Sequence, residues 1–319
     1  MANVGLTIQN GNIEYAPLIE EGINWETARK GMPGKLTFTV LKEGLIDFQE
    51  GNLVRLRVNG ADIFQGFVFA KKRDKSNTIQ VTAYDQLRYL KNKDTYQYTD
   101  TASGLIKRLA ADFRLQVGTI EDTGYTIVNR IEENKTLFDI IQNALDLTLQ
   151  NKKKIYVLYD DFGKLTLKNM ESMKLDLLID QETGENFSYQ SSIDGETYNR
   201  IKLSYDNGQT GRRDIYIAEH GENINRWGML QYFENIRETT NAKAKANALL
   251  ELYNRKTRTL SIANALGDAR VRGGTGVGII LNLGDQLVQN YMLVEKVKHV
   301  FYENEHRMDL TLRGGDFIA

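Results

Sequence analysis

The glycine-rich run Gly273–Gly278 (GGTGVG) is the first stretch whose residue types could do chemistry. A glycine loop binds phosphate when a strand precedes it and a helix begins directly after it, because backbone N–H groups and the helix dipole then face the anion. Here Ile279-Ile280-Leu281 continues the pattern as a strand, and no Gly-Lys-Ser/Thr triplet is present. The spacing therefore predicts a turn and no nucleotide site.

Carboxylates are the next candidates, and several stand in pairs: Glu132, Glu133, Asp160, Asp161, Asp180 and Glu182. A glycosidase holds two carboxyl groups roughly 5–9 Å apart across a sugar, and a sequence does not show that distance. The triplet Asp161-Phe162-Gly163 resembles the metal-binding triplet of protein kinases, which requires a His-Arg-Asp loop upstream. No histidine precedes His220, no Gly-x-Ser-x-Gly elbow occurs and the chain has no cysteine, so we predict no catalytic residue.

Two histidines flank a polar turn near the end of the chain. His299 and His306 would approach each other across a hairpin around Glu303-Asn304. With Glu303 or Glu305 they would offer imidazole and carboxylate ligands to a divalent metal. Two histidines are too few for a closed site, so we predict no metal, no cofactor, and a structural or interface role for the pair.

Net charge limits the kinds of partner. The 319 residues include 41 Lys and Arg against 42 Asp and Glu, a net charge of -1, so no basic excess favours specific binding to nucleic acid. Short basic runs occur at Lys71–Arg73 and Lys152–Lys154, which we interpret as solvated turns or as contacts with an acidic protein. No apolar run approaches the ~18 residues that span a membrane, and no signal-peptide pattern opens the chain. We therefore expect synthesis in the bacterial cytoplasm and no membrane partner.

The elements that must position these residues change character along the chain. Leu105, Ile106, Leu109, Ala110 and Phe113 share one helical stripe, with Asp100 or Thr101 as the N-cap. A second helix begins after Thr136, with Asp139 in the capping-box position, and a hairpin follows around Asp160–Gly163. These patterns predict an α+β domain over residues 100–190.

Similar β-rich units precede and follow that domain. Residues 51–85 and 276–313 each read as a strand, a turn containing Gly and Asp, a second strand with lysines at its far end, and a last alternating strand. The first strands are Val54–Val58 and Val277–Leu281, and in the former Arg55 and Arg57 alternate outward. A chain that builds a similar β unit at each end is typical of a piece of a ring.

Several segments also carry a family resemblance: YDQLRYLKNKD (84–94), KTLFDIIQNALDLT (135–148), WGMLQYFENI (227–236), LLELYNRKTRTL (249–260) and MLVEKVKHVFYENEHRMDLTL (292–312). Together they resemble the XkdQ-like proteins of the defective phage PBSX and related Gram-positive contractile tails. That group belongs with the late-control-D and central-hub proteins of contractile injection systems. The resemblance covers most of the chain and is most specific at 84–94 and 292–312.

The resemblance implies a structural baseplate hub without catalysis. In such hubs each chain carries two tube-like β domains, and three chains form a pseudo-sixfold ring between the sixfold tail tube and the threefold spike. The implied partners are two further copies, a spike protein, the tail tube or its initiator, other baseplate proteins and the tape measure. The implied location is the tail baseplate of a phage or tailocin.

We therefore expect a mainly β fold with two tube-like antiparallel β-barrel domains and an inserted α+β domain. The expected limits are residues 1–99, 100–190 and 191–319, with a helix at about 240–256 in the last domain. Six residues are expected at interfaces: Trp227, Tyr232, His299, His306, Lys71 and Lys72. Two alternatives remain, a tail-associated peptidoglycan hydrolase and a cell-surface glycan-binding module; the latter is suggested by the tyrosines and by Trp25 and Trp227.

Overall fold

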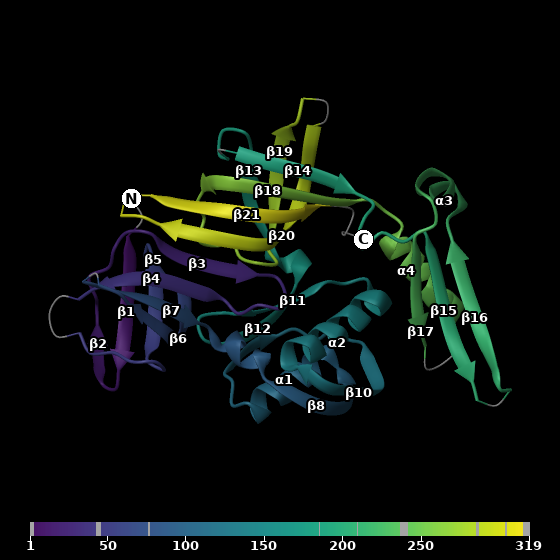
Figure 1. The fold of residues 1–319 in the computed structure, drawn as a ribbon, viewed down its shortest axis with the longest axis horizontal. Helices are drawn as coiled ribbons and strands as arrows, with labels where there is room; N and C mark the ends of the chain where they lie inside the picture. Colours follow the sequence, from purple (N-terminus) through teal and green to yellow (C-terminus); the bar gives the residue numbers. More distant parts are fainter. Residues whose placement is uncertain are drawn as a thin grey trace.

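The computed structural model of the 319-residue chain describes residues 3–42, 46–75, 77–184, 186–208, 210–236, 242–284, 287–303 and 305–314 (Figure 1). Strands dominate it, and the expected fold class, mainly β with an α+β domain between two tube-like β domains, is confirmed. Within the described ranges, thirteen strands belong to one hydrogen-bonded sheet system, which includes the first and the last strand. Among the described residues, no helix is long and apolar enough to cross a bilayer.

The first β unit is built from the N-terminal strands β1 (Val4–Asn10), β2 (Ile13–Tyr15), β3 (Ile23–Ala28), β4 (Lys35–Leu41), β5 (Leu53–Val58), β6 (Ala61–Arg73) and β7 (Thr78–Tyr84). Their spatial order is β2-β1-β5-β6-β7-β4-β3, and every neighbouring pair is antiparallel. Alternation explains the buried side: Val54, Leu56 and Val58 lie in the core while Arg55 and Arg57 face out, as the sequence predicts.

The second β unit is built from β13 (Lys174–Ile179), β14 (Asn186–Ser192), β18 (Thr257–Leu266), β19 (Gly276–Asn282), β20 (Leu287–Phe301) and β21 (His306–Gly314). Their order is β13-β19-β20-β21-β18-β14. The first unit has the same order, β1-β5-β6-β7-β4-β3, with one difference: β13 runs parallel to β19, whereas β1 runs antiparallel to β5. Each meander, β5-β6-β7 and β19-β20-β21, is therefore extended by equivalent neighbours on both sides.

In the sequence, an α+β unit with its own apolar core lies between the two β units. It contains the 3-10 helix η1 (Gln86–Lys91), β8 (Lys93–Thr101), α1 (Ala102–Asp112), β9 (Val117–Ile120), β10 (Thr126–Thr136), α2 (Leu137–Lys152), β11 (Tyr156–Asp160), β12 (Leu165–Asn169) and η2 (Met170–Met173). Both predicted caps form: Thr101 accepts from Gly104 N–H, and Thr136 accepts from Asp139 N–H at 3.1 Å. The buried residues of the two helices share one apolar core with Tyr98 of β8 and Ile127 of β10.

A smaller unit projects at one end of the molecule (Figure 1). It comprises β15 (Arg200–Asn207), β16 (Arg212–Glu219), the short helix α3 (Gly221–Trp227), β17 (Gln231–Asn235) and α4 (Ala242–Tyr253). The order β16-β15-β17 forms a separate sheet, and α4 packs against it through Ala246 and Leu249. Lys153 at the end of α2 ties α4 to the α+β unit, since its ammonium donates to Ala248 O at 3.1 Å and lies 3.3 Å from Glu251.

The expected domain limits remain a prediction, but strand pairing adds detail to them. Although β13 and most of β14 fall within 100–190, they pair with β19 and β18 of the second β unit. Burial of apolar surface explains the position of β13, because Ile179 is 2% exposed and packs into the core of the second β unit, not into the α+β core. Residues 200–253, expected within the second tube-like domain, have a sheet and a core cluster of their own.

Candidate functional site: the seam between the two β units

The two β units meet along a seam, which we define as β3 paired with the C-terminal half of β20. The pairing is antiparallel, from Lys296 opposite Ala28 to Phe301 opposite Ile23. Arg29 N–H extends the ladder by donating to Glu295 O at 2.9 Å. On the same side of β20, the N-terminal half pairs with β19 up to Leu293. One long strand thus belongs to both units.

An aromatic and imidazole stack fills the interior of the seam. The rings of Trp25 and His299 lie 4.8 Å apart and nearly parallel, and those of Phe301 and His306 lie 4.2 Å apart. His299 Nδ1 is 2.9 Å from His306 Nε2, and His299 Nε2 is 2.9 Å from Val271 O. Because a carbonyl only accepts, His299 Nε2 carries the proton, and His299 Nδ1 accepts from His306.

Both imidazoles are neutral near pH 7. Burial and the neighbouring His306 lower the pKa of His299 to about 3, and burial lowers the pKa of His306 to about 4. His299 is 0% exposed. The predicted approach of the two histidines is therefore observed, and their partners lie within the chain. Among the described residues no group of three or more potential metal ligands occurs.

Ion pairs fix the outer side of the seam. Arg29 Nε lies 2.9 Å from Glu295, and Glu26 lies 3.1 Å from Lys296 and 3.6 Å from Lys35. Burial by itself would raise the pKa of Glu26, but the two lysines bring that pKa below its usual value. The carboxylate therefore stays charged and bridges β3, β4 and β20.

A buried carboxyl pair lies where the seam meets the α+β unit. Asp85 accepts from Gly34 N–H at 2.8 Å and from Leu87 N–H at 3.0 Å, and Asp160 accepts from Gly163 N–H at 2.6 Å. Asp160 Oδ2 has no hydrogen-bond partner within the described ranges. Burial raises the pKa of Asp160 to about 6, and burial together with the Asp160 charge raises the pKa of Asp85 well above its usual value.

Arg272 of the second β unit closes this junction. Its guanidinium donates to Asp160 O at 3.0 Å and lies over the rings of Tyr159 at 4.6 Å and Trp25 at 5.8 Å. The pocket that these residues line measures about 20 Å³, which is room for about one water molecule and none for a sugar. Asp85 accepts from Gly34 of the first β unit and from Leu87 of the α+β unit, and Arg272 of the second β unit donates to Asp160 of the α+β unit, so these contacts join the three units.

Two of the other acidic candidates, Glu132 and Asp180, have structural roles. Glu132 is 1% exposed, lies 2.6 Å from Arg130 and 3.1 Å from Lys135, and accepts from Asn143. Burial opposes ionisation of Glu132, but these donors lower its pKa. The carboxylate of Asp180 is held by the hydroxyl and N–H of Thr183, which lower the pKa of Asp180. Asp161 is exposed at its hairpin turn, as are Glu133 and Glu182 on the surface.

The remaining predicted interface residues lie in two different units, Lys71 and Lys72 on β6 and Trp227 and Tyr232 in the small unit. Lys71 is nearly buried and its ammonium donates to Phe48 O at 2.5 Å, whereas Lys72 is exposed. Tyr232 stacks on Tyr253 at 5.7 Å inside the small unit. Trp227 ends α3 and is partly exposed. Of the six, only His299 and His306 are brought together.

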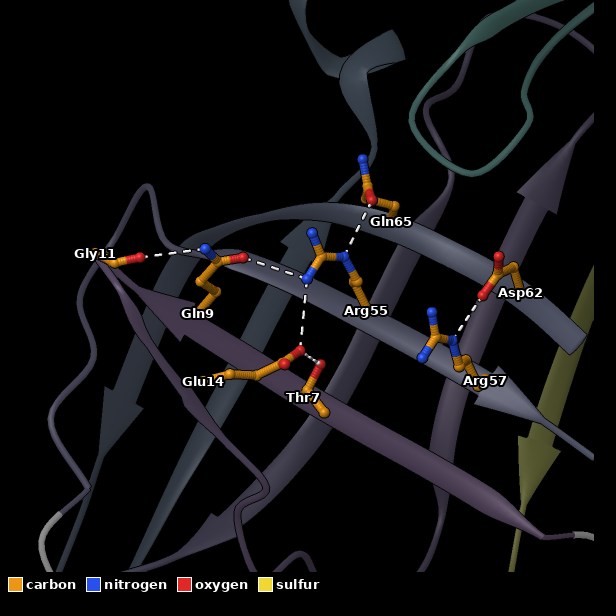
Figure 2. Close-up of polar contacts among 8 residues, drawn as sticks. All are labelled: Thr7, Gln9, Gly11, Glu14, Arg55, Arg57, Asp62 and Gln65. Atoms are coloured by element: carbon orange, nitrogen blue, oxygen red, sulfur yellow. Dashed lines mark hydrogen bonds and ion pairs between the residues drawn. The ribbon is translucent and has the colours of Figure 1, made fainter. Parts of the chain in front are cut away.

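A polar network covers the outward side of the first β unit (Figure 2). Arg55 reaches Gln65 and Gln9, each at 3.2 Å, and Glu14 at 3.4 Å, so that it links β6, β1 and β2. Arg57 pairs with Asp62 at 2.7 Å. These outward charges are paired with neighbouring residues of the same sheet, and their side chains remain partly exposed to solvent.

Sequence reasoning missed Asp85 and Trp25 as partners. Asp85 precedes a short 3-10 helix and reads as its N-cap, a role it fills by accepting from Leu87 N–H. Nothing local shows that Asp160 lies beside it. The contact of Trp25 with His299 likewise depends on pairing between the two ends of the chain, for which local periodicity carries no signal.

The sequence of this chain is similar to those of known proteins. A family model described as YQBQ-like matches residues 23–313. Two Bacillus subtilis (strain 168) proteins, "Uncharacterized protein YqbQ" and "Phage-like element PBSX protein XkdQ", are each 28% identical over 312 residues, which is 94% of this chain and 93% and 94% of theirs.

Among solved structures, the 43 kDa tail protein of prophage MuSo2 from Shewanella oneidensis has a TM-score of 0.71 at 12% identity, covering 99% of this chain and 100% of its own. A tail protein from Neisseria meningitidis MC58 has a TM-score of 0.68 at 12% identity, covering 98% and 97%. The Escherichia coli c3393 protein, described as a type VI secretion component similar to T4 gp27 and gp5, has a TM-score of 0.55 at 10% identity, covering 97% and 75%. These chains share the fold, and the family match over residues 23–313 shows that this chain belongs to the YQBQ-like family.

Proposed function

We propose that this chain is a structural baseplate hub of a contractile phage tail or tailocin. Three copies form a ring that presents six similar β units, which joins the sixfold tail tube above to the threefold spike below. The observation that carries the proposal is that both β units have the same strand order and are joined edge to edge by the seam. A closed ring needs repeated heterologous contacts of this kind.

The structure supports a role based on rigid geometry and not on catalysis. The buried carboxyl pair with raised pKa values lines a pocket of about 20 Å³, which is too small to hold a sugar. The related PBSX and prophage tail proteins carry names that fit a particle component. Expected partners are the spike, the tail tube or its initiator, the other baseplate proteins and the tape measure, and the expected location is the assembled baseplate.

The proposal is tested by the oligomer that the purified full-length chain forms. Mass photometry over a range of concentrations, followed by negative-stain imaging down the ring axis, should show a trimer with six similar densities around a central opening. A stable hexamer, or a chain that stays monomeric at every concentration, would contradict a threefold ring. A zymogram with peptidoglycan would show no clearing, and clearing that disappears in Asp161→Asn or Glu133→Gln would favour the hydrolase alternative.

A further inference from the structure

The two β units correspond residue by residue around one landmark. In the first unit Gly51 N–H donates to Val68 O at 2.8 Å, and Val68 N–H donates to Asn52 O at 2.9 Å. In the second unit Gly274 N–H and Val294 N–H form the same two bonds, with Val294 O and Thr275 O, both at 2.8 Å. Gly51 and Gly274 also share a positive φ, 90° and 98°.

A β-bulge directly after this landmark confirms the alignment. The β6–β7 register shifts between Val68 and Ala70, and the β20–β21 register shifts between Val294 and Lys296. Ala70 therefore corresponds to Lys296, and counting on places Lys72 at the position of Lys298.

The correspondence extends across the sheet to the outer strands. Leu36 of β4 lies opposite Ala83 of β7, as Leu260 of β18 lies opposite Leu312 of β21. One strand further out, Trp25 of β3 lies opposite Leu36, and Tyr189 of β14 lies opposite Leu260. Strand β14 is thus the equivalent of β3, an aromatic residue matches an aromatic residue, and Gln190 takes the place of Glu26.

The pairing of β3 with β20 occurs within the chain, but in the described part of the chain the equivalent strands β14 and β6 do not pair with each other. Strand β3 pairs with β20, but within the described ranges β14 pairs only with β18, and β6 beyond Val68 pairs only with β7. The sequence of β14, NFSYQSS, has no charge, proline or bulge to protect its edge. Unprotected edges of this kind add a strand from another chain.

We propose that β14 of one copy pairs antiparallel with the end of β6 in a second copy, in the register that β3 adopts on β20. Lys72 then lies opposite Gln190 of the neighbouring copy, as Lys298 lies opposite Glu26 in the seam. The proposal rests on the ring proposed above and identifies its contact between subunits. Seam and intersubunit ladder alternate around three copies, so all six junctions share one geometry.

The charges on the two edges fit this pairing. The end of β6 carries the exposed Lys72 and Arg73, so two copies of it repel each other. The uncharged β14 accepts that basic edge without repulsion, and both Lys72 and Gln190 are exposed in the single chain. The charges of the two strands therefore favour pairing of β14 with β6 over pairing of two copies of β6.

Disulfide trapping tests the register directly, because the natural chain has no cysteine. Full-length Lys72→Cys and Gln190→Cys are prepared separately, mixed, oxidised with copper phenanthroline and run on a non-reducing gel. Residues directly opposite in a ladder have Cβ atoms roughly 4.5–5.5 Å apart, close to what a disulfide requires. We expect a covalent dimer in the mixture and none with either variant alone.

Matched controls define the outcomes. Glu26→Cys with Lys298→Cys in one chain, opposed in the seam, should cross-link within the chain, and Lys72→Cys mixed with Asn186→Cys, displaced by about 13 Å along β14, should not. Trimers that cross-link in the seam control but not at Lys72 and Gln190 overturn the pairing and leave the ring intact. A chain that neither cross-links nor assembles at any concentration overturns the ring as well.

A gain-of-function variant gives an independent readout. Gln190→Glu restores at the intersubunit ladder the acidic residue that the seam has at Glu26, so it should strengthen assembly by about twofold to fivefold. Gln190→Lys should weaken assembly by a similar factor. Equal assembly of both variants, measured by mass photometry, would overturn the proposed register.

Discussion

Replacing Asp160 by asparagine should stabilise the protein above pH 6. The variant keeps the oxygen that accepts from Gly163 N–H and removes a charge held beside the buried carboxyl of Asp85. Burial moves the pKa of Asp160 from 3.8 to about 6. Each pKa unit corresponds to about 1.4 kcal/mol, so the ionised carboxylate costs the folded state at most about 3 kcal/mol.

The pH dependence of this effect has a definite sign. A folded-state pKa above the unfolded value means that the stabilising proton is fully present below about 3.8 and is lost as the pH rises through about 6. Wild type and Asp160→Asn should therefore have similar free energies of unfolding near pH 4. Above pH 6 the variant should be more stable by about 1–3 kcal/mol, a range that allows for structural relaxation around the charge.

Urea titrations followed by tryptophan fluorescence measure this difference, because Trp25 lies against the same cavity. The matched control is Asp161→Asn, which removes an equal charge from the neighbouring exposed position and should change stability by less than about 0.5 kcal/mol. An advantage of equal size at pH 4 and pH 7.5, or a loss of stability at pH 7.5, would refute the assignment of a strained buried pair.

Three further perturbations probe the seam and the small unit. Gly273→Ala should destabilise the fold by about 1–3 kcal/mol in urea titrations, because its Cβ would lie 2.2 Å from Ala28 C, whereas Gly5→Ala, with open space around it, should not. Because the pKa values of His299 and His306 are lowered in the folded protein, their contribution to stability is complete above about pH 6.5 and is lost as the pH falls towards 4 and 3. The variant His306→Asn should therefore show a flatter dependence of melting temperature on pH in that window. A profile identical to that of the wild type would count against this role of the histidine pair. Trp227→Ala should leave the melting temperature within a few degrees and weaken trimer formation in mass photometry; intact assembly would remove Trp227 from the interface.

Local sequence patterns predicted local structure well. The alternation at Val54–Val58 and the caps at Thr101 and Thr136 each depend on neighbouring residues, and each is observed. The hairpin that brings His299 to His306 also depends on a short connection. Such features are encoded by spacing alone.

Long-range pairing was beyond the reach of those patterns. The Arg29–Glu295 bond joins residues 266 positions apart, and a sequence contains no local sign of it. The placement of β13 beside β19 and the separate sheet of residues 200–235 likewise follow from which apolar faces meet. The buried pair of Asp85 and Asp160 arises only once three units are in contact.

Strand β20 has a mechanical consequence for any machine that contains this chain. A pull on one β unit travels into the other along the covalent backbone of a single strand, and a load along β20 acts on the β3 ladder in shear. Strand β20 is continuous from Leu287 to Phe301 along this path. Torque applied to one β unit would therefore be transmitted to the other through the same strand.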